Sequence, residues 1–194
     1  MPTPRLRKPK LVDVETHRIV RYRDGYDYIA LSYVWGGVKQ LAYQLGDTLS
    51  LDAPIPATLE DAMAVVHHLG KKYLWVDSLC IDQGNATEKD EQIPLMSAIY
   101  TGAWTTIFNV AGQSANSGLP RVSSQKDVIP QMSCTVGGQQ LLSLMPSLSR
   151  QISRSLWHSR AWTFQEGLLS PRRLFFTNHQ VYFECNLVQC CESL

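Results

Sequence analysis

Short apolar, β-branched runs alternate with longer amphipathic stretches in the first half of this chain. The runs at 28–35, 73–76 and 105–111 predict buried strands. Between them, apolar stripes at 57–69 and 87–102 predict helices. Because strand–helix–strand units of this length require parallel strands with right-handed crossovers, the pattern predicts an α/β parallel sheet flanked by helices.

Capping residues suggest where these helices begin and end. Thr58 is a candidate N-cap with Asp61 three residues later, and Gly70 follows the first helix. Thr87 can cap the second helix, although Pro94 would move its true start to about residue 92. The positions expected to point inward from the second helix are Ile93, Met96, Ile99 and Tyr100.

The remaining segments add strands and helices to this frame. Residues 112–145 are rich in Gly, Ser and Gln, which predicts an insertion. Within it, Gly137-Gly138 would be the turn of a hairpin. The other expected elements are two short strands in 11–22, hairpin strands at 131–136 and 139–144, helices at 146–157 and 159–169, and strands at 172–177 and 180–185.

Composition narrows the class of protein. The 194 residues are 44% hydrophobic and 18% charged, with a net charge of +1, so no global field attracts nucleic acid or an anionic membrane. No apolar stretch approaches a membrane span, and no secretory signal opens the chain. The five cysteines form no CxxC pair, which favours reduced thiols, no zinc site and a cytoplasmic location.

The ends of the chain are expected to lie outside the folded domain. Residues 1–10 carry the basic cluster Arg5, Arg7, Lys8 and Lys10 in a proline-rich stretch, which predicts a solvated tail. Residues 187–194 are expected to begin a further C-terminal region.

Polar side chains follow the strand at 73–76. Asp77, Ser78, Asp82 and Gln83 come at or just past its carboxyl end. In open α/β sheets ligands bind at this edge, although capping of the next loop by the two aspartates is an equal alternative.

Two side chains are candidates for the catalytic residue. Glu166 lies beside Trp162 and Phe164, and an apolar setting would raise the pKa of its carboxyl group if it is buried. The alternative for Glu166 is an exposed helix position. Cys80, with His67 and His68 upstream, is a candidate nucleophile, but a cysteine after a strand is more often buried and inert. No Gly-rich phosphate loop occurs.

Four blocks of sequence occur in a fixed order along the chain. They are YIALSYVWG (28–36), PATLEDAMAVVHHLGKKYLWVDSLCIDQ (56–83), EKDEQIPLMSAIYTGA (88–103) and RAWTFQE (160–166). Together they resemble the fungal heterokaryon-incompatibility (HET) domain, over residues 11–186 with an insertion at about 112–150. The resemblance implies a domain of fungal non-self recognition that triggers programmed cell death, a form of innate immunity.

The segment Trp162-Thr163-Phe164-Gln165-Glu166 is similar to the pattern Trp-Cys-x-x-Glu of the TIR domain, with Thr163 in place of the cysteine. The TIR domain, which the chain thus also resembles, is a flavodoxin-like fold of signalling and NAD-cleaving proteins. This resemblance implies that Glu166 is the catalytic residue of an NAD glycohydrolase, with NAD as substrate and no tightly bound cofactor or metal. The residues expected to bind substrate are Ser32, Trp35, Gly36, Asp77, Asp82 and Trp162.

A second hypothesis is a non-catalytic assembly module. Many TIR-like domains act by self-association and recruit partners, and an upstream recognition protein is then expected. The contact surfaces would be the apolar segment 79–81 and the insertion at 112–145.

Overall fold

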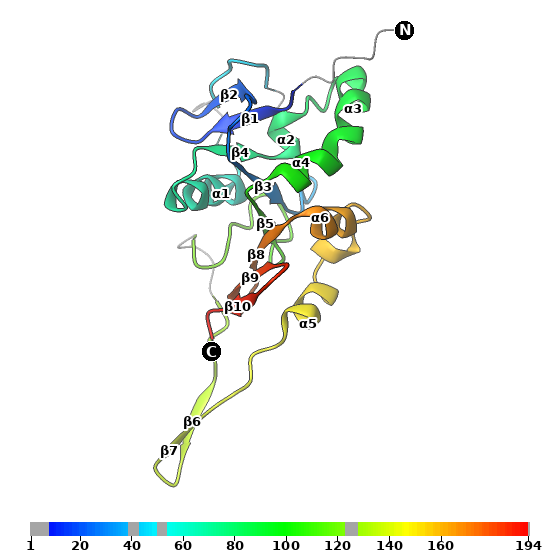
Figure 1. The fold of residues 1–194 in the computed structure, drawn as a ribbon. Helices are drawn as coiled ribbons and strands as arrows, with labels where there is room; N and C mark the ends of the chain where they lie inside the picture. Colours follow the sequence, from blue (N-terminus) through cyan, green and yellow to red (C-terminus); the bar gives the residue numbers. More distant parts are fainter. Residues whose placement is uncertain (1–7, 39–42, 50–53, 123–127, 194) are drawn as a thin grey trace.

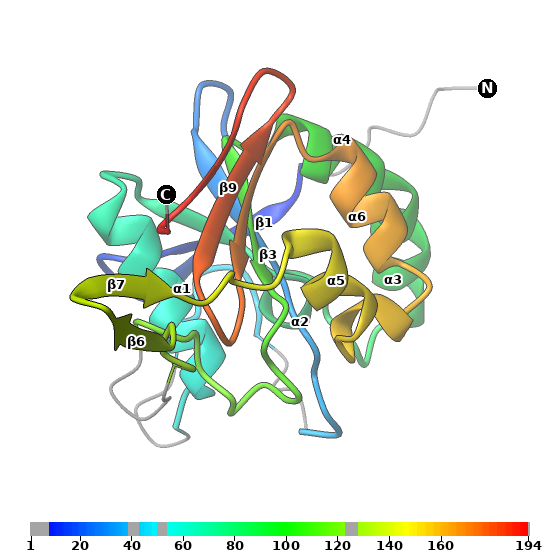
Figure 2. The same cartoon turned by 90° about the horizontal axis from the view of Figure 1, so that it is seen from below.

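A mixed β-sheet with helices on both faces forms the centre of the molecule (Figures 1 and 2). The computed structural model describes residues 8–38, 43–49, 54–122 and 128–193. In chain order its strands are β1 (Lys10–Asp13), β2 (Arg18–Arg21), β3 (Tyr28–Ser32), β4 (Tyr73–Trp75), β5 (Thr105–Asn109), β6 (Ser133–Val136), β7 (Gln139–Leu142), β8 (Arg172–Phe176), β9 (Val181–Cys185) and β10 (Gln189–Cys191). Its helices are α1 (Ala57–His68), α2 (Asp77–Cys80), α3 (Ala86–Gln92), α4 (Met96–Gly102), α5 (Leu148–Ser153) and α6 (Thr163–Leu169), with short 3₁₀ helices η1 (Ile93–Leu95) and η2 (Trp157–Ser159).

The centre of the sheet is parallel, as the sequence predicts. The strand order is β10-β9-β8-β5-β3-β4-β1-β2. The strands β8, β5, β3 and β4 pair in parallel, whereas β1/β2 and β9/β10 are antiparallel additions at the two sides. The α/β class with extra terminal strands is therefore confirmed.

Every residue of β3 and β5 is buried because both faces of these central strands are covered. Helix α1 lies on one face, and α3, α4, α5 and α6 lie on the other (Figures 1 and 2). A smaller apolar cluster joins α5 and η2 to the sheet through Leu148, Trp157, Phe108, Phe175 and Tyr182. The carboxyl ends of β3, β5 and β8 are thereby brought under α5 and α6.

The first long helix forms where expected, but its cap differs. The side chain of Thr58 makes no cap bond and instead accepts from Asn109 Nδ2 at 3.4 Å. Asp61 accepts from the backbone N–H of Leu119 at 2.6 Å. The two polar groups therefore bind the end of β5 and the segment after it, and the predicted capping box is wrong. Gly70 does follow the helix with a φ of +66°, as predicted.

The second helical stretch is interrupted by proline. Asn85, rather than Thr87, caps α3 and accepts a backbone hydrogen bond from the first turn. Pro94 converts the middle of the stretch into η1, so the predicted start near residue 92 is wrong. Ile93 is 40% exposed, unlike the other three positions that were expected to point inward.

The insertion contains the predicted hairpin. Gly137 and Gly138 form the turn between β6 and β7, with φ values of +58° and +80°. Each residue of both strands is exposed, and the hairpin extends away from the sheet (Figure 1).

The two ends of the domain differ from expectation. Lys10 is buried in β1, and its Nζ lies 2.7 Å from Glu88 Oε1, so it does not belong to a solvated tail. Arg5 and Arg7 lie outside the described residues. Strand β10 continues the sheet past residue 186. Among the described helices, none is long and apolar enough to cross a bilayer.

Candidate active site

A cavity of about 430 Å³ opens at the carboxyl ends of β3 and β4. The loop after β3 and helix α2 form one side, and α3, α4 and α6 supply the remaining walls. The lining residues are Val34, Trp35, Gly36, Asp77, Ile81, Gln83, Lys89, Ile93, Met96, Arg160, Trp162 and Glu166. Two carboxylates, two cations and two indoles thus share one mostly apolar cavity.

Glu166 lies in the first turn of α6 and is only 3% exposed. The Ser32 hydroxyl at the end of β3 donates to Glu166 Oε2, and the Tyr100 hydroxyl also hydrogen-bonds this carboxylate. Trp157 Nε1 donates in turn to Ser32 Oγ at 2.7 Å. These contacts fix both the position of the carboxylate and the rotamer of Ser32.

Burial and the polar neighbours of Glu166 shift the pKa of its carboxyl group in opposite directions, and the net result is a raised pKa. Loss of solvent raises the pKa of this carboxyl group above its usual value. The hydrogen bond from Ser32, the positive charge of Arg160 and the hydrogen bond from Tyr100 act in the opposite direction. A buried carboxylate supported by donors is suited to stabilise positive charge on a ligand.

Asp77 brings a second carboxylate to the same cavity. It is the first residue of α2, and its Oδ1 accepts from the Ser78 backbone N–H at 2.8 Å and from Trp35 Nε1 at 3.3 Å. Burial and then the negative charge of Glu166 raise the pKa of Asp77 to about 6. The two acids, 89 positions apart in the sequence (166 − 77), therefore interact electrostatically in the fold.

Two cations line the cavity near these acids. Arg160 donates to the backbone carbonyl of Tyr33, which ties the segment before α6 to the end of β3. Lys89 Nζ lies 3.4 Å from the carbonyl oxygen of Gln83. An anionic portion of a ligand would find both charges on the cavity wall.

Gly36 packs closely against the segment after β5, which requires a residue without a side chain. Its φ is +65°, and a Cβ added there would lie 2.3 Å from Ser114 Cβ. The segment after β5 therefore fills the side of Gly36 on which a Cβ would lie, while Gly36 itself lines the cavity. Trp162 lies at the cavity wall and is 49% exposed, so its indole is open to both ligand and solvent.

Asp82 is absent from the cavity lining. Its Oδ1 accepts from the Gly84 backbone N–H at 2.9 Å, and its Oδ2 accepts from Gln44 Nε2 at 3.1 Å. The loop-capping alternative describes these contacts, so the expectation that Asp82 binds substrate has no support in its position.

The rival nucleophile Cys80 is buried. Burial raises the pKa of its thiol to about 12, which disfavours the thiolate. His67 and His68 are exposed at the end of α1. The neighbouring Leu79 and Ile81 are buried as well, so the apolar segment 79–81 belongs to the core and is not a contact surface. Across the described part of the chain, no three His, Cys, Asp or Glu side chains gather as metal ligands.

Sequence reasoning missed four residues of this site. Tyr100 was expected only as an inward apolar position, and Trp157 was not singled out. Arg160 begins the block RAWTFQE, yet neither it nor Lys89 received a role. Charged and hydrogen-bonding residues within the resembling blocks were the signal that could have found Arg160 and Tyr100.

Comparison with known proteins agrees with these blocks. The sequence model of the family described as "Heterokaryon incompatibility protein (HET)" matches residues 28–166, which include both Ser32 and Glu166. A curated relative from Neurospora crassa, "Heterokaryon incompatibility protein 6, OR allele", is 24% identical over 200 residues, covering 79% of this chain and 29% of the relative. The chain thus spans less than a third of that relative's length, and no solved structure matches it. Because the family match covers well over half of the sequence, this chain belongs to the heterokaryon-incompatibility (HET) family.

Proposed function

We propose that this domain is a cytoplasmic cell-death effector that cleaves NAD at the nicotinamide–ribose bond, with Glu166 as the catalytic residue. The observation that carries the proposal is the buried Glu166 carboxylate, held by Ser32 and Tyr100 at the wall of an indole-lined cavity.

One correctly positioned carboxylate can be sufficient to catalyse this reaction. Cleavage of the bond passes through an oxocarbenium-like sugar, as in glycoside hydrolysis. Nicotinamide is cationic in NAD and leaves as a neutral molecule, so no acid has to protonate it. Glu166 would bind the ribose hydroxyls and stabilise the positive charge that develops on the sugar. A water molecule would then add to the same sugar carbon and lose a proton to solvent, which completes the hydrolysis.

The other walls supply suitable contacts for the rest of the substrate. The indoles of Trp35 and Trp162 can stack on a ring. Arg160 and Lys89 are placed to neutralise the diphosphate. A cavity of about 430 Å³ lies within the range of small-molecule sites. We expect it to enclose the nicotinamide riboside portion, with the adenosine end extending outward.

The topology of the sheet also supports the proposal. Counted along the chain, β3, β4, β5 and β8 are the first to fourth parallel strands, and their spatial order is second, first, third, fourth. The flavodoxin-like order begins in this way, and its ligands bind beyond the carboxyl ends of the strands near the first and third. Ser32 and the cavity lie at this edge.

The test is nicotinamide release from NAD over a range of protein concentrations. We expect Glu166→Gln to abolish release, while Glu60→Gln, an exposed glutamate of α1, leaves the rate unchanged. Release that persists in Glu166→Gln would overturn the catalytic role. Matched thermal unfolding of the two variants ensures that any loss reflects chemistry.

A second candidate function, assembly without catalysis, has an observation in its favour. Phe164 and Leu168 are four positions apart on α6 and are 72% and 66% exposed, and Leu156 nearby in sequence is 51% exposed. Such a face is typical of self-association or of docking by an upstream recognition protein. If killing requires only assembly, Phe164→Lys with Leu168→Lys should abolish it and Glu166→Gln should not.

A further inference from the structure

A second cavity, of about 310 Å³, lies at the carboxyl ends of β5 and β8, beneath α5. Val110 and Ala111 after β5 form its floor together with Thr177 after β8. It shares no lining residue with the cavity that contains Glu166. Carboxyl ends of parallel strands are the usual ligand edge of such sheets, so a built site here is physically reasonable.

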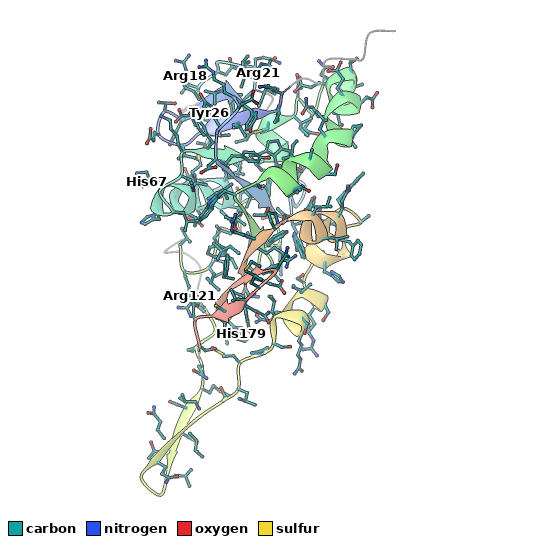
Figure 3. All side chains as sticks on the ribbon, in the orientation of Figure 1. Arg18, Arg21, Tyr26, His67, Arg121 and His179 are labelled. Atoms are coloured by element: carbon teal, nitrogen blue, oxygen red, sulfur yellow. The ribbon has the colours of Figure 1, made fainter. Side chains whose placement is uncertain are left out.

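The walls of this cavity are basic and polar. Arg150 and Arg154 come from α5 and the residue after it, and Asn178 and His179 come from the turn between β8 and β9. His179, labelled in Figure 3, lies in the turn where β8 ends and β9 begins. Among the described residues, no carboxylate lines the cavity.

Four side chains on these walls have hydrogen-bond donors without a partner among the described residues. Within the described ranges, no salt bridge or side-chain hydrogen bond engages the guanidinium groups of Arg150 and Arg154 or the side chains of Asn178 and His179. By contrast, the nearby Arg121 is paired with Glu192 at 2.7 Å. Arg150 and Arg154 carry like charges on the wall of one cavity, and a bound anion would offset their repulsion.

The frame around these donors is firmly held. Gln151 Nε2 donates to the Tyr182 hydroxyl at 3.0 Å, and that hydroxyl donates to the Pro146 carbonyl at 2.7 Å. Leu148 of α5 is buried in the smaller apolar cluster. Arg150 lies in this anchored helix and Arg154 is the residue after it, which lowers the entropic cost of using them in binding.

We propose that this second cavity binds a small phosphate-bearing anion through Arg150, Arg154, Asn178 and His179. Guanidinium groups match phosphate oxygens in bidentate geometry, and amide and imidazole N–H groups add further donors. The volume is at the lower limit for small-molecule sites, so the ligand is pyrophosphate or a phosphate ester no larger than a mononucleotide.

The cavity is also connected to the Glu166 site through a short segment. Ser155 lines the cavity and accepts from the backbone N–H of His158 at 3.1 Å. Between them in the chain lies Trp157, whose indole donates to Ser32. A ligand on Arg154 therefore binds three residues from a member of the Glu166 network, and we expect its binding to rigidify that segment.

Calorimetric titration of the protein with inorganic pyrophosphate and with AMP tests the proposal. We expect saturable binding of at least one probe, weakened about tenfold or more by Arg150→Gln with Arg154→Gln, because two charge-assisted contacts are lost. The control is Arg23→Gln, an exposed arginine outside the cavity, which should leave binding unchanged.

Lys89→Gln distinguishes this site from the catalytic cavity, because Lys89 is one of the two cations that line the first cavity. Binding of the probe that survives Lys89→Gln but not the double arginine change supports a separate anion site, whether or not the protein cleaves NAD. Equal binding in the double variant and the Arg23→Gln control, or no binding of either probe, would overturn the proposal. Loss in Lys89→Gln alone would place the anion in the first cavity.

Discussion

The hydroxyl of Ser32 donates a hydrogen bond to the carboxylate of Glu166, a residue 134 positions later in the chain. Ser32 ends β3 and Glu166 lies in the first turn of α6, so the bond joins the central strand to the helix above it. Trp157 completes the contact by donating to the same hydroxyl. The geometry of the candidate site therefore depends on a correctly formed sheet.

Ser32→Ala should raise the pKa of Glu166, because the hydrogen bond that favours its charged form is lost. The acidic limb of the pH–rate profile for the proposed NAD cleavage should then move to higher pH. The change also leaves Trp157 Nε1 unpaired, at a cost of about 1–3 kcal/mol in the free energy of unfolding. A pH–rate profile and urea unfolding measure the two effects. Ser78→Ala is the control, since it removes a buried hydroxyl bonded to Tyr33 and should leave the acidic limb in place.

Asp77→Asn should stabilise the protein at neutral pH. The pKa of Asp77 is raised from 3.8 to about 6, so between these values the folded state retains a proton that the unfolded chain has lost. The free energy of unfolding consequently falls as pH rises through this window, by at most about 3 kcal/mol. Asparagine keeps the acceptor for Trp35 and Ser78 but cannot ionise.

Urea unfolding at several pH values from 3.5 to 8 provides the measurement for Asp77→Asn. The variant and the parent should be similarly stable at the acidic end and diverge as pH rises toward neutral. Parallel curves over the whole range would contradict the raised pKa. Asp24→Asn, at an exposed surface position, is the matched control.

Gly36→Ala and Gly37→Ala should differ in cost although both glycines have a positive φ, of +65° and +73°. At Gly37 nothing lies within 4 Å of an added Cβ, so only the left-handed backbone opposes alanine, by about 1 kcal/mol. At Gly36 the added Cβ would also lie 2.5 Å from Ser114 Cα, which is backbone and cannot rotate away. Thermal unfolding should show the larger loss for Gly36→Ala, and equal losses would contradict the close packing.

Removal of the hairpin should leave the domain folded. All residues of β6 and β7 are exposed, so replacing residues 132–143 by a short Gly-Ser link removes no core contact. We expect a change in the free energy of unfolding within about 0.5 kcal/mol, measured with urea. Sedimentation of the same variant tests whether the insertion contributes to self-association. Val136→Lys with Leu141→Lys, which keeps the hairpin, is the companion variant.

The central strands could be predicted because each is a short apolar run between helical stretches. Strand β10 could not, because its three residues are exposed and no buried apolar run marks the segment that pairs with β9. The break at Pro94 was expected, but its outcome depended on neighbouring turns, which accommodate the proline as a 3₁₀ segment.

Only some residues of the candidate site could be predicted from the sequence. Glu166 stands out through its aromatic neighbours and the blocks that resemble known domains. Its partners Tyr100 and Trp157 could not be identified, because hydrogen bonds between distant segments leave no local pattern. Asp82 follows the same strand as Asp77, yet five residues of chain turn it toward the loop instead of the cavity.

The pairing of β8 beside β5 has a consequence for synthesis on the ribosome. Ser32, Asp77 and Tyr100 all emerge before the long segment that leads to α6, whereas Trp157, Arg160 and Glu166 emerge after it. A partly translated chain therefore holds half of the cavity without its buried glutamate. Parallel pairing across such a separation is slow compared with local folding. If Glu166 is the catalytic residue, a nascent or truncated chain has an incomplete cavity and is inactive until the last parallel strand is in place.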